Sequence, residues 1–176
     1  MALWYFVSIL IKSPTRSGSS KGFTLIFMPT LFDFAQAPGH LIRRAQQIAV
    51  AEFTRETAEH EVTPVQFAFM NAMMETPGVD QITLANRVAF DAATSGSVIG
   101  RLEGKGWVRR EADPLDRRRK LLFITPDGAR AVQAMTSAVA LAQENILAPL
   151  SAQEQKTFLR LLAKMVAGHE QAAESR

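Results

Sequence analysis

The chain has 176 residues, a formal net charge of +3 and 47% hydrophobic residues, which is enough for one packed domain of ordinary size. It has no cysteine, which excludes disulfide scaffolds, thiol catalysis and zinc fingers and suits a cytoplasmic protein. The three histidines, His40, His60 and His169, show no metal-ligand spacing, and the chain has no phosphate-binding loop or nucleophile motif. We therefore expect no metal, no cofactor and no enzyme activity.

Residues 1–37 show no regular pattern. An apolar run from Trp4 to Ile11 precedes a stretch, Ser13 to Lys21, that is rich in serine, glycine and basic residues. No charged residue precedes the apolar run, as a secretory signal requires, and the run is too short to span a membrane. We expect an N-terminal extension that is disordered or partly mis-assigned, with the working start near Met28, and no membrane association.

Three helices are expected after the extension. Apolar residues recur at helical spacing over residues 39–59. A second helix begins at the capping box Thr63–Gln66 and runs to about Met74. Asp80 can cap a third, shorter helix over residues 81–90. The inward residues of this third helix are Leu84, Ala85 and Val88.

A fourth helix is expected over residues 91–105, capped by Asp91 and followed by Gly106 in a left-handed position. Its apolar face holds Val98, Ile99 and Leu102, and its outer face is small and polar. The glycines on or beside that outer face, at positions 96, 100 and 104, should each cost about 1 kcal/mol relative to alanine. Two interpretations are open: the backbone lies close to a partner such as a nucleic-acid groove, or the helix is held by its apolar face and tolerates glycine.

A basic β-hairpin is expected next. Trp107–Glu111 and Leu121–Thr125 have strand-like composition, and Asp113-Pro114 marks a turn between them. The segment from Arg101 to Lys120 holds eight basic and four acidic residues, a net charge of +4, whereas the whole chain carries only +3. This concentration of positive charge fits a phosphate-binding surface, and the alternative is a solvated charged face.

Two long helices complete the chain. One begins at Thr125-Pro126 and ends before Pro149, and the other begins at the capping box Ser151–Glu154. The last helix is expected to bury Phe158, Leu161, Leu162, Met165 and Val166.

The expected fold is mainly α with a small β-hairpin wing. A winged helix-turn-helix at about residues 63–125 is flanked by long helices at 38–60 and 126–169. The domain spans residues 38–169, and residues 170–176 form a tail.

Residues 38–169 resemble the MarR family of winged helix-turn-helix transcription regulators. Three segments carry the resemblance: Gln81–Ala85, Arg101–Val108, and Asp113–Arg119 leading to Leu122–Thr125. A further segment, Gly39–Arg44, looks like the first helix of the branch that regulates the degradation of aromatic acids.

The resemblance implies a homodimer whose flanking helices interlock and whose two recognition helices enter successive major grooves of a palindromic operator in double-stranded DNA. It implies that Thr94, Ser95 and Ser97 approach base edges and phosphates. A wing arginine, Arg118 with Arg117 or Arg119 beside it, would enter the minor groove, and Asp116 would brace the wing. Arg101 is a further candidate for DNA contact, although in the family this arginine often packs locally.

One position departs from the family. Many members place an aspartate just before the Arg-Leu of the recognition helix, where it can pair with a wing arginine. Here that position is Gly100. The usual ion pair between recognition helix and wing is therefore in question.

The resemblance also implies a small-molecule effector, bound between the dimer helices and the winged unit. An aromatic carboxylate or acyl thioester needs a cationic group beside an apolar wall. The residues expected near it are His40, Arg43, Arg44, Gln66, Phe67 and Met70. The alternative is that the two arginines are solvated and the methionine-rich helix is ordinary core.

Together these features predict a ligand-responsive, DNA-binding transcriptional regulator. We expect a repressor of aromatic-compound catabolic or efflux genes that is released by a small aromatic acid or its CoA thioester. The alternative is a winged-helix protein-interaction module without sequence-specific DNA binding. A small enzyme using His40 is disfavoured, because no acid/base pair has a spacing that would bring it to a nucleophile.

Overall fold

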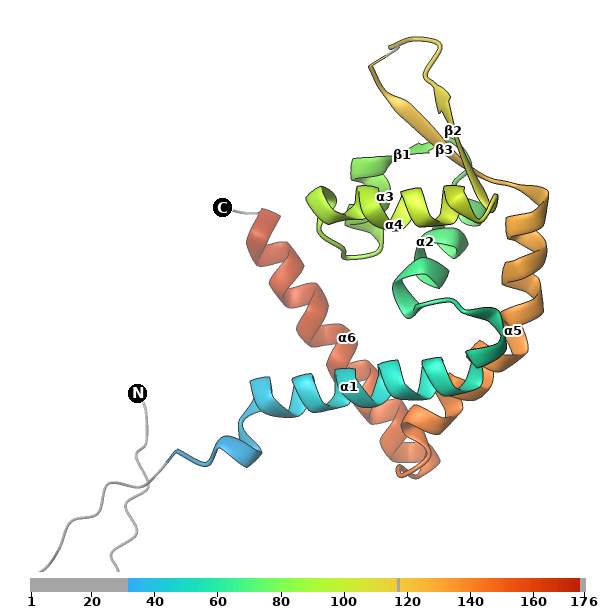
Figure 1. The fold of residues 1–176 in the computed structure, drawn as a ribbon. Coiled ribbons are helices and arrows are strands. Elements are labelled where there is room, and N and C mark those ends of the chain that lie inside the picture. Colours follow the sequence, from blue (N-terminus) through green and yellow to red (C-terminus); the bar gives the residue numbers. More distant parts are fainter. Residues whose placement is uncertain (1–31, 117, 175–176) are drawn as a thin grey trace, which may run out of the picture. The chain divides into compact units, whose positions relative to one another are not determined.

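A computed structural model describes residues 32–116 and 118–174 of the chain (Figure 1). The chain divides into two compact units, residues 1–44 and 45–176. Most of the predicted N-terminal extension, residues 1–31, lies outside the described residues, so its expected character stays a prediction.

Helix α1 (Pro38–Glu56) crosses from the first unit into the second. It confirms the first predicted helix but ends three residues earlier, and a short 3-10 helix, η2 (Ala58–His60), follows it. Before α1 the first unit contains another 3-10 turn, η1 (Phe34–Gln36). The Asp33 side chain caps η1 by accepting a hydrogen bond from the Gln36 backbone N–H at 3.3 Å.

Helix α2 (Pro64–Glu75) lies at the centre of the second unit. Its predicted capping box is confirmed: Thr63 Oγ1 accepts from the Gln66 N–H at 3.2 Å, and Gln66 Oε1 accepts from the Thr63 N–H at 3.0 Å. Several of its side chains are fully or almost fully buried in the hydrophobic core: Phe69, Met70, Ala72 and Met73.

Helices α3 (Gln81–Arg87) and α4 (Ala92–Gly104) form the predicted helix-turn-helix. Helix α3 is three residues shorter than expected, because Ala89 adopts a left-handed backbone with φ of 51° and starts the turn. The caps at Asp80 and Asp91 are confirmed, and Leu84, Ile99 and Leu102 are fully buried.

The wing consists of β2 (Val108–Ala112) and β3 (Lys120–Ile124), paired antiparallel with Val108 opposite Ile124. Both strands lie within one residue of their predicted positions. A two-residue strand, β1 (Val79–Asp80), was not predicted. It pairs antiparallel with β3 and makes a three-stranded sheet of order β1-β3-β2.

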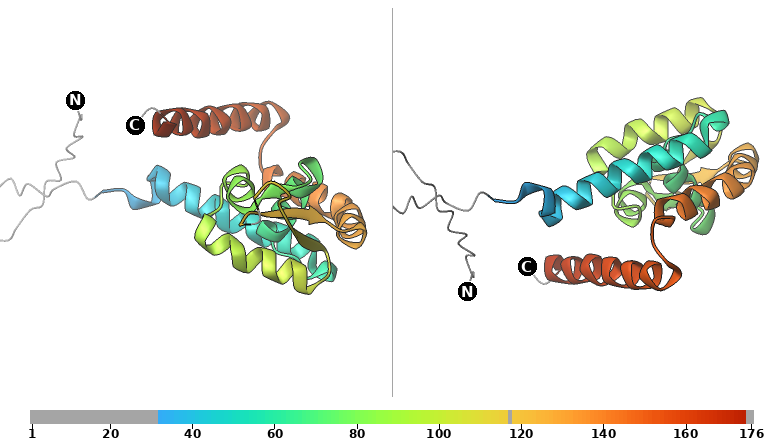
Figure 2. Two further views of the ribbon diagram at one scale, coloured as in Figure 1. Left: turned by 90° about the horizontal axis from the view of Figure 1, so that it is seen from above. Right: turned by 90° about the horizontal axis from the view of Figure 1, so that it is seen from below.

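Helices α5 (Pro126–Leu147) and α6 (Ala152–Glu174) follow the wing and are joined by a short connection (Figure 2). Helix α5 contributes Val132, Met135 and Ala142 to the buried residues. Helix α6 continues to Glu174, so residues 170–174 of the predicted tail are helical.

The predicted burial of the α6 side chains is wrong for this single chain. The five residues Phe158, Leu161, Leu162, Met165 and Val166 are 37% to 51% exposed. The apolar stripe is present, but no element of the described chain covers it. Within the described ranges, no helix is both long and apolar enough to cross a membrane.

Candidate nucleic-acid interface

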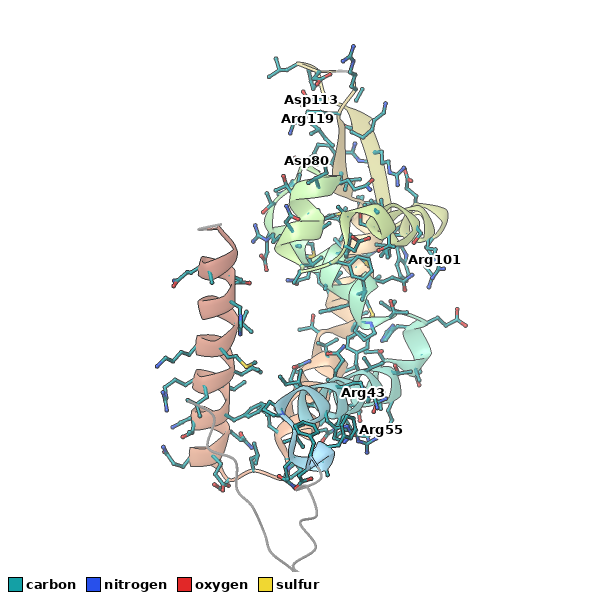
Figure 3. The ribbon with its side chains drawn as sticks, turned by 90° about the vertical axis from the view of Figure 1, so that its left-hand side faces the viewer. Arg43, Arg55, Asp80, Arg101, Asp113 and Arg119 are labelled. Atoms are coloured by element: carbon teal, nitrogen blue, oxygen red, sulfur yellow. The ribbon has the colours of Figure 1, made fainter. Side chains whose placement is uncertain are left out.

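The outer face of α4 is exposed and polar. Thr94, Ser97 and Arg101 are all exposed there. The Thr94 N–H donates to Asp91 Oδ1 at 2.9 Å, and the Ser97 hydroxyl donates to Thr94 O at 2.8 Å. The hydroxyl oxygens keep lone pairs that can accept hydrogen bonds from a partner. Arg101 has no ion pair with any described residue and is free to meet a phosphate (Figure 3).

Ser95 is not on this face, which contradicts its expected contact with DNA. It is fully buried between α3 and α4. Its hydroxyl donates to Ala92 O at 2.6 Å and accepts from Gln81 Nε2 at 3.0 Å. The hydroxyl is therefore used to join the two helices of the helix-turn-helix.

Gln81 is the residue that the sequence interpretation missed at this junction. Besides Ser95, its Nε2 lies 3.4 Å from Ala92 O. A Cβ added at Gly96 would lie 3.4 Å from the same Nε2, an ordinary contact distance, so the glutamine does not require glycine at this position. The position of Gln81, at the first residue of α3, was visible in the sequence, but its partner on α4 was not.

The other two α4 glycines face open space. A Cβ at Gly100 or Gly104 would meet no atom within 4 Å. Nothing in the described chain therefore requires glycine at these positions. This finding leaves the backbone available for close approach by a partner.

The wing carries its basic residues at and beside its tip. Arg118 is exposed, and its side chain has no ion pair with any described residue. Its backbone N–H donates to Asp116 Oδ1 at 2.9 Å, so Asp116 contacts this segment through the backbone, and the expected brace through the arginine side chains stays a prediction. Arg117 lies outside the described residues, and Arg119 is held between two carboxylates, those of Asp80 and Asp113.

Recognition helix and wing are joined by an ion pair even though Gly100 removes the usual one. Arg110 Nε on β2 lies 3.3 Å from Glu103 Oε2 on α4, and both side chains are about one-third exposed. Lys105, at the end of α4, donates to Glu61 O at 2.8 Å and lies over the Trp107 ring, 4.6 Å from its centroid.

The six expected effector residues fall in two places. His40, Arg43 and Arg44 lie in the part of α1 that belongs to the first unit, where the His40 ring is 4.5 Å from the Phe34 ring. His40 Nδ1 is buried and has no hydrogen-bond partner among the described residues. Arg43 is exposed.

The other three expected effector residues lie on α2. Met70 is fully buried in the core, which fits the alternative that the methionines are ordinary core residues. Gln66 is 7% exposed and is occupied by its capping box. Phe67 is half-buried, with its ring 5.9 Å from that of Phe53. In the described part of the chain, no group of His, Asp and Glu side chains could hold a metal ion.

A helix-turn-helix with an exposed polar second helix, followed by a basic β-wing, defines a winged helix-turn-helix protein. The comparisons with known proteins give the family. A model described as MarR family matches residues 60–119. The chain is 32% identical over 127 residues to the transcriptional regulator HosA of Escherichia coli O111:H-, covering 72% of this chain and 93% of HosA.

Two further proteins are similar over most of their length. The HTH-type transcriptional repressor NicR of Pseudomonas putida is 31% identical over 143 residues, 81% of this chain and 90% of NicR. BpsR of Bordetella bronchiseptica, whose structure addresses regulation of its DNA binding by 6-hydroxynicotinic acid, has a TM-score of 0.73. It is 30% identical and covers 77% of this chain and 96% of BpsR. The chain belongs to the MarR family and is a transcriptional regulator, not an enzyme.

Proposed function

We propose that the protein is a repressor that binds a palindromic operator as a homodimer and is released by a small aromatic acid or its CoA thioester. The observation that carries the DNA-binding part is the pairing of an exposed, small and polar face on α4 with an exposed Arg118 on the adjacent wing. Both belong to one compact unit, so a single duplex can meet them together.

Helix α4 would lie in the major groove. Thr94 and Ser97 offer hydroxyl groups to base edges or phosphates, and the bare backbone at Gly100 and Gly104 permits close approach. Arg118, with Arg117 beside it, would enter the minor groove, where the negative potential attracts arginine. Arg101 would contact a phosphate.

The effector part of the proposal rests on the first turns of α1. Arg43 is exposed, and the unpartnered Nδ1 of His40 can donate to or accept from a ligand. An arginine beside an imidazole suits a carboxylate on an aromatic ring. The described effector of BpsR, 6-hydroxynicotinic acid, belongs to this class.

Salt dependence tests DNA binding. A labelled set of genomic fragments should yield at least one palindromic site whose affinity falls steeply with log salt, because each neutralised phosphate contributes about 0.9 to the slope. Arg118→Ala should lower both affinity and slope. Arg130→Ala is the matched control, because Arg130 is exposed on α5 and pairs with Asp127 outside the interface. Binding that is absent or insensitive to salt would favour the protein-interaction module.

A thermal-shift panel tests the effector class. Phenolic acids, 6-hydroxynicotinic acid and matching CoA thioesters should be compared with benzene-ring compounds that lack a carboxyl group. A ligand at 100 times its Kd raises the free energy of unfolding by about 2.7 kcal/mol. Arg43→Gln should abolish the shift, and an undiminished shift in that variant would remove Arg43 from the proposed site.

A further inference from the structure

Arg119 lies where the wing meets the helix-turn-helix. Its Nη2 is 3.2 Å from Asp80 Oδ2, and its Nη1 is 3.5 Å from Asp113 Oδ2 (Figure 3). The backbone reinforces the second contact, because the Asp113 N–H donates to Arg119 O at 3.1 Å. The arginine therefore joins the two sides of the wing to each other and to the start of α3.

Asp80 is fixed in place to receive this arginine. It ends β1 opposite Leu121 of β3, and it caps α3. Its Oδ1 accepts from the N–H groups of Ile82 and Thr83, both at 3.1 Å, which leaves Oδ2 for the Thr83 hydroxyl and Arg119. Hydrogen bonds from Thr83, and then from Arg119, lower the pKa of Asp80, so the carboxylate stays charged.

Asp113 is the second anchor and is 7% exposed. Its Oδ1 accepts from the Leu115 N–H at 2.8 Å, so the side chain also shapes the turn at the wing tip. One guanidinium between two carboxylates leaves no surplus positive charge for a phosphate. Arg118, its neighbour in the chain, has no such partner among the described residues.

We propose that Arg119 is a positioning residue that holds the wing at a fixed angle to α3, and through α3 to α4, and does not itself bind DNA. The inference rests on the proposed DNA binding. The pairing of β1 with β3 and the Arg110–Glu103 ion pair hold the base of the wing, and Arg119 adds a contact nearer its tip. Without this contact the tip could bend away, and Arg118 would no longer reach the minor groove while α4 sits in the major groove. Arg119 would thus affect affinity through the placement of Arg118.

The Asp80→Asn variant distinguishes a contact that positions the wing from a simple effect of negative charge near the DNA. Asparagine caps a helix about as well as aspartate, so α3 is retained, but the charged contact to Arg119 is lost. We expect DNA affinity to fall about threefold to tenfold, the range of one partly exposed ion pair or somewhat more. Glu111→Gln is the control: it also removes one negative charge, from the hairpin that carries Arg119 but without touching Arg119. It should raise affinity, because a negative charge near DNA is lost.

The salt slope separates positioning from direct contact. Affinity is measured by fluorescence anisotropy on a genomic fragment selected by the wild-type protein, at several salt concentrations. Arg118→Gln should make the slope shallower by about 0.9 for each lost phosphate contact. Arg119→Gln should weaken binding with the wild-type slope, and Arg119→Lys should restore part of the affinity.

A double variant completes the test. If Asp80 and Arg119 act only through their contact with each other, the double variant Asp80→Asn with Arg119→Gln should bind DNA no more weakly than either single variant. Higher affinity in Asp80→Asn, or a slope in Arg119→Gln that falls as it does in Arg118→Gln, would overturn the inference and leave the proposed function standing. If the wild-type protein selects no fragment, the proposed function fails first. Asp113→Asn provides a second variant should Asp80→Asn not fold by circular dichroism.

Discussion

Gly100 and Gly104 leave two gaps on the outer face of α4 that no part of the described chain fills. Each glycine weakens the helix, since alanine is favoured at such a position by about 1 kcal/mol. Their presence is understandable if the bare backbone faces DNA. Replacing such a glycine with alanine should raise the free energy of unfolding but lower the affinity for DNA. The two effects can therefore be measured separately.

We predict that Gly104→Ala raises the free energy of unfolding by up to about 1 kcal/mol and lowers DNA affinity. Urea unfolding measures the first effect and anisotropy the second. Gly100→Asp is a second test at a similar position, because a Cβ at residue 100 also meets no atom within 4 Å. Stronger DNA binding by Gly100→Asp would indicate that a brace to the wing is missing, and unchanged binding by Gly104→Ala would contradict close backbone approach.

Gly128 has a different role, in packing. A Cβ added there would overlap the carbonyl oxygen of Trp107, which is backbone and cannot move aside cheaply. We predict that Gly128→Ala lowers the free energy of unfolding by about 1–3 kcal/mol, the usual cost of overpacking. Thermal and urea unfolding measure it. Gly104→Ala is the control, since the same methyl group is added in open space, and equal stability of the two variants would contradict the clash.

Burial at single residues could be predicted only in part. Ser95 lies four residues before Ile99 and seven before Leu102, so helical spacing places it on the buried face with them. The signal was present, but serine at the start of a recognition helix also suggests DNA contact. The role of Arg119 had no local signal, because it depends on Asp80, 39 residues away in the sequence.

At the scale of elements, the helix starts were the most predictable features. Thr63, Asp80, Asp91 and Thr125 all cap helices as their residue types predict, because a side-chain oxygen can satisfy a free N–H of the first turn. Strand β1 was missed, because two residues carry no periodicity and the strand exists only through its pairing with β3.

The capping box of α2 gives a prediction at this scale. Helix α2 carries much of the core, so loss of its cap should destabilise the whole second unit. Thr63→Ala should lower the free energy of unfolding by about 1 kcal/mol. Thr63→Ser keeps the hydroxyl and is the control. If both variants unfold at the same urea concentration as the wild type, the hydrogen bonds of the box contribute nothing measurable.

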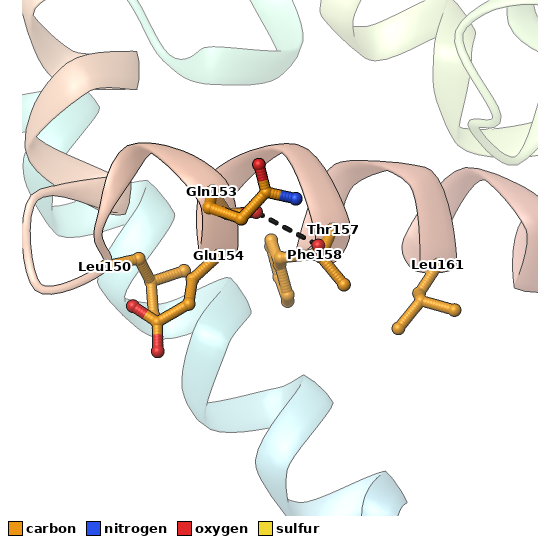
Figure 4. Close-up of a pocket in the computed structure, with 6 residues that line it drawn as sticks. All are labelled: Leu150, Gln153, Glu154, Thr157, Phe158 and Leu161. Atoms are coloured by element: carbon orange, nitrogen blue, oxygen red, sulfur yellow. Dashed lines mark hydrogen bonds between the residues drawn. The ribbon is translucent and has the colours of Figure 1, made fainter.

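At the scale of the whole molecule, the uncovered stripe on α6 is the main difference between expectation and structure. Helical spacing predicts the apolar face, and only the family resemblance, which implies a homodimer, predicts what covers it. The stripe begins beside a shallow hollow at the start of α6 (Figure 4), lined by Leu150, Gln153, Glu154, Thr157, Phe158 and Leu161. In the proposed homodimer, a second copy of the chain covers this stripe.

Leu161→Glu tests that proposal. Leu161 is 51% exposed in the single chain, so a carboxylate there is tolerated by the monomer but not in an apolar interface. We predict a monomer by light scattering and loss of cooperative binding to a palindromic site. Ala167→Glu places the same charge on the opposite side of α6 and should remain dimeric. A dimeric Leu161→Glu variant would contradict the role of the stripe.

The start of α5 is fastened to the base of the wing, so a tilt of the helix would move the wing. The Thr125 N–H donates to Trp107 O at 2.9 Å, its hydroxyl donates to Gly106 O at 2.7 Å, and Gly128 closes against Trp107. The 22 residues of α5 extend from this junction. Such a helix is about 33 Å long, so tilting it by about 10° at its far end moves the junction about 6 Å, half the width of a major groove. A small tilt at the end of α5 far from the DNA would therefore produce a larger displacement of the wing.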